Sequence, residues 1–171
     1  MKLTRAIILA MTATLVTGCV EEGEETPRFD TFVLEDSYGE LSTTNGPDTA
    51  LRLNPYILDG EFIIRSKATS KDSHYYSLGI SQSRDSEITM IYDTSCGSDP
   101  EATQCDNKET LKCHYTSDLT MYCGVLDAET NTATDISGLL DTIPMIVYLR
   151  ASICRRDLAS CDSTYQVVEL L

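Results

Sequence analysis

The segment ETLKCHYTSDLTMYCGVL, residues 109–126, decides the fold of this chain. A turn at residues 117–119 brings Cys113 directly opposite Cys123 in an antiparallel hairpin. Side chains two residues apart in a strand point to the same face, so the apolar neighbours of both cysteines share their side of the hairpin. A single register therefore predicts one cross-strand disulfide and one apolar face, with Leu111 opposite Val125 and Tyr115 opposite Met121.

A second pair of cysteines predicts another hairpin near the end of the chain. Two β-rich runs, 143–153 and 163–170, flank a charged turn, and pairing Cys154 with Cys161 closes that turn. Residues 145–149 are apolar on both faces, which is typical of a central strand. The same closure sets two further pairs of opposing residues, Val147 with Val168 and Met145 with Leu170.

Six cysteines follow residue 19, and six cysteines allow 15 disulfide connectivities. The two hairpins leave Cys96 and Cys105, which we expect to form a third local disulfide around the loop 97–104. Each such bridge is worth about 2.5 kcal/mol in the chain-entropy account of disulfides. Zinc sites, the alternative use of several cysteines, usually contain pairs two to four residues apart, and no such pair is present.

Shorter β-rich runs fill the rest of the chain, and no long helical pattern appears. Eight or nine short strands separated by turns predict an antiparallel β-sandwich, immunoglobulin-like or similar, with a small β-barrel as the alternative. We expect single strands at 30–34, at 50–58, where Pro55 breaks the strand, and at 61–68. We also expect a hairpin of 74–82 with 87–93, and one weak helical turn at 135–141. In that hairpin the side chains expected to face inward are Tyr76, Leu78, Ile80, Ile88, Met90 and Tyr92.

The N-terminus carries the features of an export signal. Lys2 and Arg5 precede an apolar run at 6–16, which is about half of the ~20 residues that a spanning helix needs. The run ends in Leu-Val-Thr-Gly-Cys at 15–19, which resembles a bacterial lipobox. The resemblance implies removal of residues 1–18 and acyl chains on Cys19 that hold the protein to a membrane. Val20 after the cysteine favours the outer membrane over the inner one.

An acidic tether and one domain follow the signal. Residues 19–29 contain four glutamates and Pro27, a composition that favours an extended spacer. Residues 30–171 have the length of one ordinary domain. Residues 1–18 carry two of the 13 basic residues and none of the 27 acidic ones, so the mature net charge is about −16. Such a surface repels phosphate backbones, which excludes nucleic acid as a partner.

The sequence contains no catalytic motif of a known kind and predicts no cofactor. Only His74 and His114 are available as bases near neutral pH, and both are expected at the surface. One weak calcium candidate has oxygen ligands at positions 1, 3, 5 and 9 of a loop but lacks the glycine and glutamate that complete it. Its residues are Asp127, Glu129, Asn131 and Asp135, and a second acidic set comprises Asp93, Asp99, Glu101 and Asp106.

We therefore expect a non-catalytic, lipid-anchored protein of the bacterial cell envelope. Its acyl chains on Cys19 would hold it to a membrane, and it would serve as an accessory subunit that docks on an envelope protein. The alternative is a carbohydrate or small-ligand binder, with or without a dependence on calcium, and a third is an enzyme. Tyr75, Tyr122 and Tyr148 lie on strand faces opposite the apolar sets, where amphipathic rings are suited to partner contact or to ordinary cross-strand packing.

Overall fold

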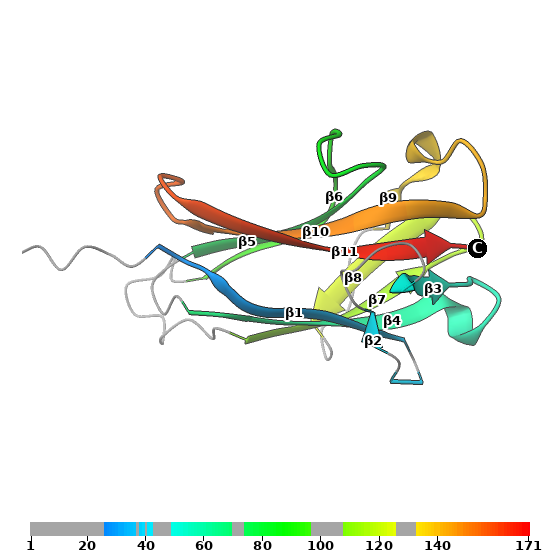
Figure 1. Cartoon of the computed structure of the whole chain (residues 1–171), viewed down its shortest axis with the longest axis horizontal. Coiled ribbons are helices and arrows are strands. Elements are labelled where there is room, and N and C mark those ends of the chain that lie inside the picture. Colours follow the sequence, from blue (N-terminus) through cyan, green and yellow to red (C-terminus); the bar gives the residue numbers. More distant parts are fainter. Residues whose placement is uncertain are drawn as a thin grey trace, which may run out of the picture.

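The computed structural model describes residues 26–36, 38–39, 41–42, 49–69, 74–96, 108–125 and 133–171. These residues form two β-sheets that lie face to face across a shared core (Figure 1). Short 3₁₀ turns, η2 (Leu58–Gly60) and η3 (Ser137–Leu139), are the helical segments within them. The predicted all-β class is confirmed, and the third predicted disulfide, Cys96–Cys105, lies outside the residues whose side chains are described.

The first sheet contains six strands in the order β2-β1-β4-β7-β8-β9, and every pairing in it is antiparallel. β4 and β7 occupy its centre and supply much of the face that packs on the second sheet. The strands are β1 (Phe29–Asp36), β2 (Leu41–Ser42), β4 (Glu61–Ala68), β7 (Lys108–Tyr115), β8 (Thr120–Val125) and β9 (Thr134–Asp135).

The second sheet contains five strands in the order β3-β11-β10-β5-β6. β10 is the third strand of five, which confirms the predicted central position of residues 145–149. β3 runs parallel to β11, so the expectation of a wholly antiparallel arrangement is wrong. β2 is an edge strand of the first sheet, and the next strand, β3, is an edge strand of the second sheet, where it runs in the same direction as β11. The strands are β3 (Leu51–Leu53), β5 (His74–Ser81), β6 (Thr89–Cys96), β10 (Met145–Arg155) and β11 (Cys161–Leu170).

The described residues form eleven strands rather than the eight or nine expected. The two that match no expected run, β2 and β9, contain two residues each, and β3, which lies within the run expected at 50–58, contains three. An alternation of apolar and polar residues needs about four residues to be recognised in a sequence, so strands this short can be identified only from their hydrogen bonds to neighbouring strands. The broken strand expected at 50–58 is likewise reduced to β3, because Pro55 begins a turn.

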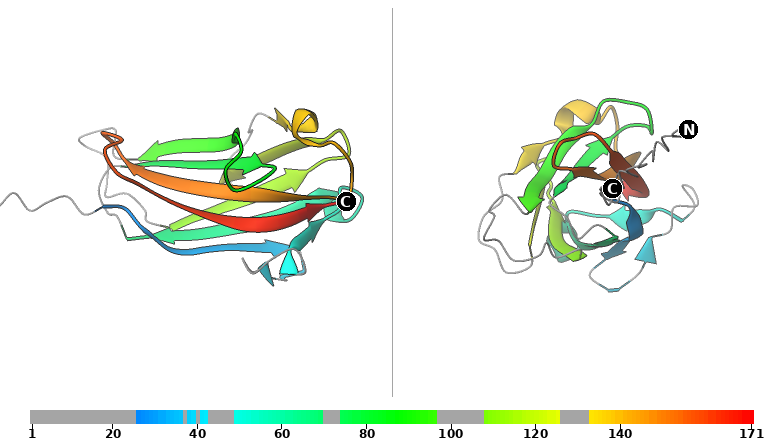
Figure 2. Two further views of the ribbon diagram at one scale, coloured as in Figure 1. Left: turned by 45° about the horizontal axis from the view of Figure 1, so that its top comes forward. Right: turned by 90° about the vertical axis from the view of Figure 1, so that its left-hand side faces the viewer.

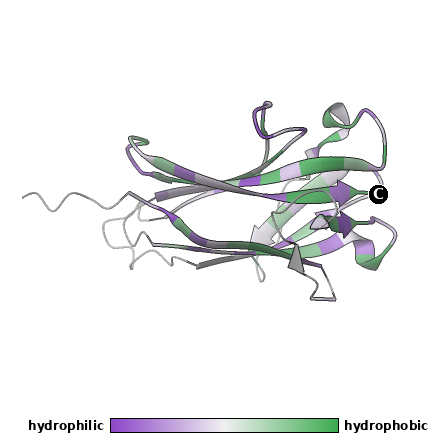
Figure 3. Cartoon of the chain, viewed as in Figure 1, coloured by the Kyte–Doolittle hydropathy of each residue, from purple (hydrophilic) through white to green (hydrophobic). Residues whose placement is uncertain are grey.

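Apolar side chains from both sheets fill the space between them. Phe62, Leu78 and Leu149, from three different strands, are fully buried. Figure 3 shows the alternation of hydrophobic and hydrophilic residues along β10 and β11 that directs one face inward. One buried polar contact also joins the sheets, since the Gln166 side-chain amide donates a hydrogen bond of 3.0 Å to the backbone carbonyl of Phe32.

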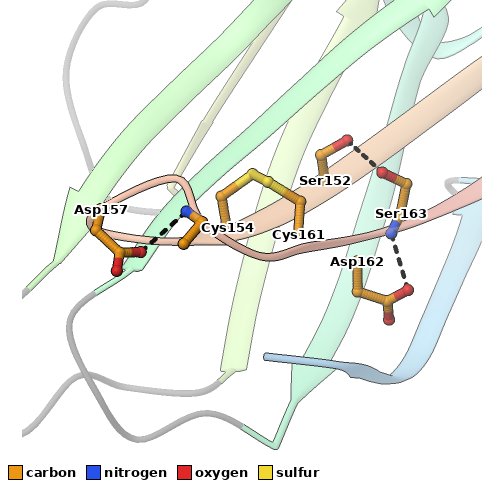
Figure 4. Close-up of a disulfide and its surroundings, with 7 residues drawn as sticks. Ser152, Cys154, Asp157, Cys161, Asp162 and Ser163 are labelled. Atoms are coloured by element: carbon orange, nitrogen blue, oxygen red, sulfur yellow. Dashed lines mark hydrogen bonds between the residues drawn. A yellow bond between two sulfur atoms is a disulfide. The ribbon is translucent and has the colours of Figure 1, made fainter. Parts of the chain in front are cut away.

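Both predicted hairpin registers are confirmed. Cys113 pairs with Cys123 across β7 and β8, and Cys154 pairs with Cys161 across β10 and β11. Each pair forms a disulfide, with Cα–Cα distances of 4.1 and 4.0 Å. The first bridge is fully buried, whereas the second lies at the surface beside a bond between the Ser152 and Ser163 hydroxyls (Figure 4).

The hairpin of β5 and β6 departs from its predicted register because it contains a β-bulge. Leu78 pairs with Tyr92 but Gly79 pairs with Met90, so Ile91 is the extra residue. The bulge reverses the parity of the residues before it: Ile91 is buried, whereas Met90, predicted to face inward, is half exposed. Tyr92, after the bulge, packs against the core as predicted. Gly79 permits this packing, since a Cβ there would lie 2.2 Å from a methyl carbon of Ile88.

The two ends of the pair of facing sheets are distinct (Figures 1 and 2). Residues 26–28 and the β10–β11 turn lie at one end, here named the tether end, where the Phe29 amide donates to the Asp162 carboxylate at 2.8 Å. Leu171 lies at the opposite end, here named the C-terminal end. The β3–β4 connection, the β7–β8 turn and residues 136–144 lie there as well, because β10 begins opposite Leu170.

Tyr115 provides a test of the core. Its ring is fully buried and its hydroxyl has no hydrogen-bond partner in the described residues, while burial, with a smaller contribution from Tyr56, raises its pKa above 10.0. A raised tyrosine pKa stabilises the folded state below pH 10, and this stabilisation is lost as pH rises through the folded-state value. We therefore expect Tyr115→Phe to raise the free energy of unfolding by about 1 kcal/mol and to delay alkaline unfolding.

Urea titrations followed by far-ultraviolet circular dichroism at pH 7 and above pH 10 measure both effects. Tyr75→Phe is the matched control, because that ring is 41% exposed and its hydroxyl can bind water. A Tyr115→Phe variant that is less stable than the parent at pH 7 would show that the hydroxyl has a partner that stabilises the fold.

Candidate functional site

Exposed apolar side chains gather at the C-terminal end of the molecule. In the β3–β4 connection, Tyr56 is 83% exposed, and Ile57 and Leu58 are each about half exposed. Tyr38, which follows β1, and Ile143, which precedes β10, are exposed large side chains at the same end. Soluble domains rarely leave adjacent large apolar side chains in water without a binding role. We name these five residues the apolar tip.

The backbone of the β3–β4 connection explains why these side chains point outward. The Asn54 side chain accepts a hydrogen bond of 2.9 Å from the Tyr56 amide, and its carbonyl accepts one of 3.0 Å from Ile57. Leu58 and Asp59 then adopt φ values of 50° and 54°, and Gly60 adopts 65°. Left-handed φ values are disfavoured for leucine by about 1–2 kcal/mol, and such strain is concentrated at functional positions.

A cavity of about 230 Å³ opens beside the apolar tip. Leu53, Leu58 and Leu171 contribute apolar walls, and the chain end is fixed there because the Leu171 amide donates to the Leu53 carbonyl at 2.9 Å. Tyr38 and Ile57 border the same cavity, so the tip combines protruding side chains with an adjacent recess. This combination is suited to an apolar partner surface that has both a ridge and a hollow.

The two histidines occupy different environments. His114 lies on the outer face of the first sheet, as predicted, where its ring stacks on Tyr122 at a centroid distance of 4.7 Å. His74 is only 4% exposed, so its predicted surface position is wrong. It shares the parity of Tyr76 and Leu78 in β5, and that parity directs its side chain inward. The two rings therefore lie on different sheets and form no joint site.

The predicted calcium loop is represented by one residue. Asp135 is exposed in β9, and its carboxylate accepts hydrogen bonds from Ser137, which lower its pKa. Asp127, Glu129 and Asn131 lie outside the described residues. Asp93 is exposed on β6, and Asp99, Glu101 and Asp106 also lie outside them. Within the described parts of the chain, no three acidic, histidine or cysteine residues are placed to hold a metal ion.

The predicted tyrosines lie on separate surfaces. Tyr75 is exposed on β5 near the tether end, and Tyr122 belongs to the stack with His114. Tyr148 lies on the outer face of the second sheet beside Tyr165, with ring centroids 5.7 Å apart. The sequence reasoning missed Tyr165, although the predicted β10–β11 register contains the signal that places these two rings side by side.

The chain matches no known family model, and no curated protein is significantly similar to it in sequence. Among the described residues there is also no helix with the length and apolar character needed to cross a membrane.

Proposed function

We propose that this protein is a lipid-anchored accessory subunit of the bacterial cell envelope that docks on a partner protein through its apolar tip. The proposal combines the lipobox-like sequence ending in Cys19 with one structural observation, the exposed side chains of Tyr56, Ile57 and Leu58. The partner surface is an apolar patch with a shallow hollow, and the contact is non-catalytic. We further propose an outer-membrane location and a β-sandwich architecture for the two facing sheets.

The position of the apolar tip supports this orientation. Cys19 precedes residue 26 by seven positions, a tether that reaches at most about 25 Å. Residue 26 lies at the tether end, and the eleven residues of β10 span about 36 Å towards the opposite end. An acyl anchor on Cys19 would therefore hold the tether end near the membrane and direct the apolar tip towards partners beyond the lipid surface.

The composition of the tip supports a protein as its occupant. Tyrosine provides a large rigid contact area at little conformational cost, and such side chains surrounded by aliphatic residues are frequent at the centres of interfaces. A lipid surface is the less suitable occupant, because the tip is bordered by Asp36, Asp59 and Glu61 against Arg52, which leaves a net negative charge that anionic headgroups would repel.

A photoreactive amino acid at position 56, introduced into the full chain in cells, tests this proposal. We expect one dominant protein adduct on irradiation. The adduct should fall about tenfold or more in yield when Leu58→Asp is added, because a buried unpaired carboxylate strongly weakens an apolar contact. Aspartate tolerates the left-handed φ of position 58 better than most residues, so the variant should remain folded.

Leu158 provides a matched control at the tether end. It is also a leucine with positive φ, 58°, and is 63% exposed. Leu158→Asp should leave the adduct from position 56 unchanged, whereas Cys19→Ser should lower its yield by releasing the chain from the membrane. Equal adducts from positions 56 and 158, or an adduct that survives Leu58→Asp, would contradict docking through the apolar tip.

A further inference from the structure

We propose that the outer face of the second sheet carries a binding site for an acidic sugar unit, a pyranose ring that bears a carboxylate. A cavity of about 220 Å³ lies there, between strands β5, β10 and β11 and the β5–β6 turn. This volume is below the range of about 300–1,000 Å³ typical of drug-sized ligands, so it suits a single ring. The site lies apart from the apolar tip and is independent of the docking proposal.

Two tyrosines form the apolar wall of this cavity. Tyr148 on β10 and Tyr165 on β11 are diagonal neighbours across the strand pair, with their ring planes inclined at 60°. Tyrosine rings provide the flat apolar surface on which the C–H face of a pyranose packs, and their hydroxyls remain available to its oxygens. Ser163 and Thr164 contribute two further hydroxyl groups to the same cavity.

Two arginines supply positive charge to the same cavity. Arg150 lies on β10 directly opposite Tyr165, and Arg84 reaches over the Tyr165 ring from the β5–β6 turn, with its Cζ 4.7 Å from the ring centroid. The turn is internally fixed, because the Ser83 amide donates to the Ser86 hydroxyl at 2.9 Å and the Ser81 hydroxyl donates to the Ser83 carbonyl at 2.9 Å. The turn therefore fixes the backbone position from which the exposed Arg84 side chain reaches the Tyr165 ring.

The pairing of charges indicates a carboxylate as the ligand group. Five other surface cations of the described residues form salt bridges with acidic side chains, namely Arg52, Arg65, Lys67, Lys112 and Arg155. Neither Arg84 nor Arg150 forms a salt bridge within the described residues, although the net charge of the chain is −14. Asp85 also lines the cavity, which leaves it with one net positive charge. Two guanidinium groups without carboxylate partners are suited to bind one planar carboxylate.

Isothermal titration of the purified full chain with glucuronate, glucose and acetate tests the site. We expect glucuronate to bind at least about tenfold more tightly than either glucose or acetate, because only glucuronate engages the arginines and the tyrosine rings together. Arg150→Gln should weaken glucuronate binding about ten- to hundredfold, the usual loss for a charged hydrogen-bonding partner. Binding should also weaken as salt concentration rises.

Arg52→Gln is the matched control, since Arg52 is an exposed arginine of the same sheet that pairs with Glu169 outside the cavity. It should leave glucuronate affinity unchanged. Several outcomes would overturn the proposal: no heat of binding at millimolar glucuronate, equal affinities for glucuronate and glucose, or equal loss from Arg52→Gln and Arg150→Gln. If acetate bound as tightly as glucuronate, the sugar ring would contribute nothing to binding and the site would be a carboxylate site only. If a short glutamate peptide bound more tightly than glucuronate, the site would be assigned to acidic protein segments instead.

Discussion

Replacing Gly60 with alanine is expected to lower the free energy of unfolding by about 3 kcal/mol or more, and to leave part of the protein unfolded at 37 °C. Gly60 has a φ of +65°, and a Cβ there would lie 1.9 Å from the carbonyl oxygen of Tyr115 and 2.9 Å from its carbonyl carbon. These are backbone atoms of a buried strand, so they cannot rotate away as a side chain would. The β3–β4 connection and the end of β7 would have to separate.

Urea denaturation followed by far-ultraviolet circular dichroism gives the measurement. Gly39→Ala is a close control, because Gly39 also has a positive φ, +79°, but a Cβ there meets nothing within 4 Å. It should therefore show only the conformational penalty of the left-handed region, about 1 kcal/mol. If the two variants lose the same stability, the close approach of Gly60 to Tyr115 does not exist in solution.

Removing the buried disulfide is expected to have the second large effect. The double variant Cys113→Ala/Cys123→Ala should lose about 4 kcal/mol of unfolding free energy. Opening a loop with a sequence separation of 10 accounts for about 2.5–3 kcal/mol in the chain-entropy account. The rest comes from the space left by two sulfur atoms whose residues are both fully buried in the core between the sheets, with Cys113 directly opposite Phe62 in the first sheet.

Removing the surface disulfide separates the chain-entropy contribution from the contribution of the space left in the core. Cys154→Ala/Cys161→Ala opens a loop with a sequence separation of 7, but Cys161 is exposed, so only the chain-entropy part of about 2.5 kcal/mol is expected. Thermal and urea unfolding of both double variants, with the parent under oxidising conditions, gives the comparison. A larger loss for the surface pair than for the buried pair would contradict this account of the core.

The hairpin registers could be predicted because two independent constraints agreed in each. A disulfide fixes which residues oppose each other, and side-chain parity fixes which face is buried. In β7 and β8 both constraints give the same answer, and Cys113 and Met121 are fully buried as expected. The β5–β6 hairpin has no such cysteine pair within its predicted length. A single bulge at Ile91 therefore changed which side chains before Tyr92 face inward, without any change in the alternating sequence.

The surfaces argued to be functional were harder to predict. The apolar residues Tyr56, Ile57 and Leu58 fall within a run expected to be a strand broken by Pro55, and the sequence does not show that the turn after Pro55 and the left-handed backbone of Leu58 leave all three side chains exposed. The arginine–tyrosine cavity joins residues more than sixty positions apart. Arg84 could be placed beside Tyr165 only once the pairing of β5 with β10 was known, and no local pattern contains that information.

The direction of β1 has a mechanical consequence. β1 runs from the tether end towards the C-terminal end and is joined to β4 along most of its length. A load between the membrane anchor and a partner at the apolar tip would act along this strand, perpendicular to its backbone hydrogen bonds. Such bonds resist together in shear instead of opening one at a time. The Phe29–Asp162 and Gln166–Phe32 contacts would distribute part of that force into the second sheet, so under the proposed function the domain would resist extension as one unit.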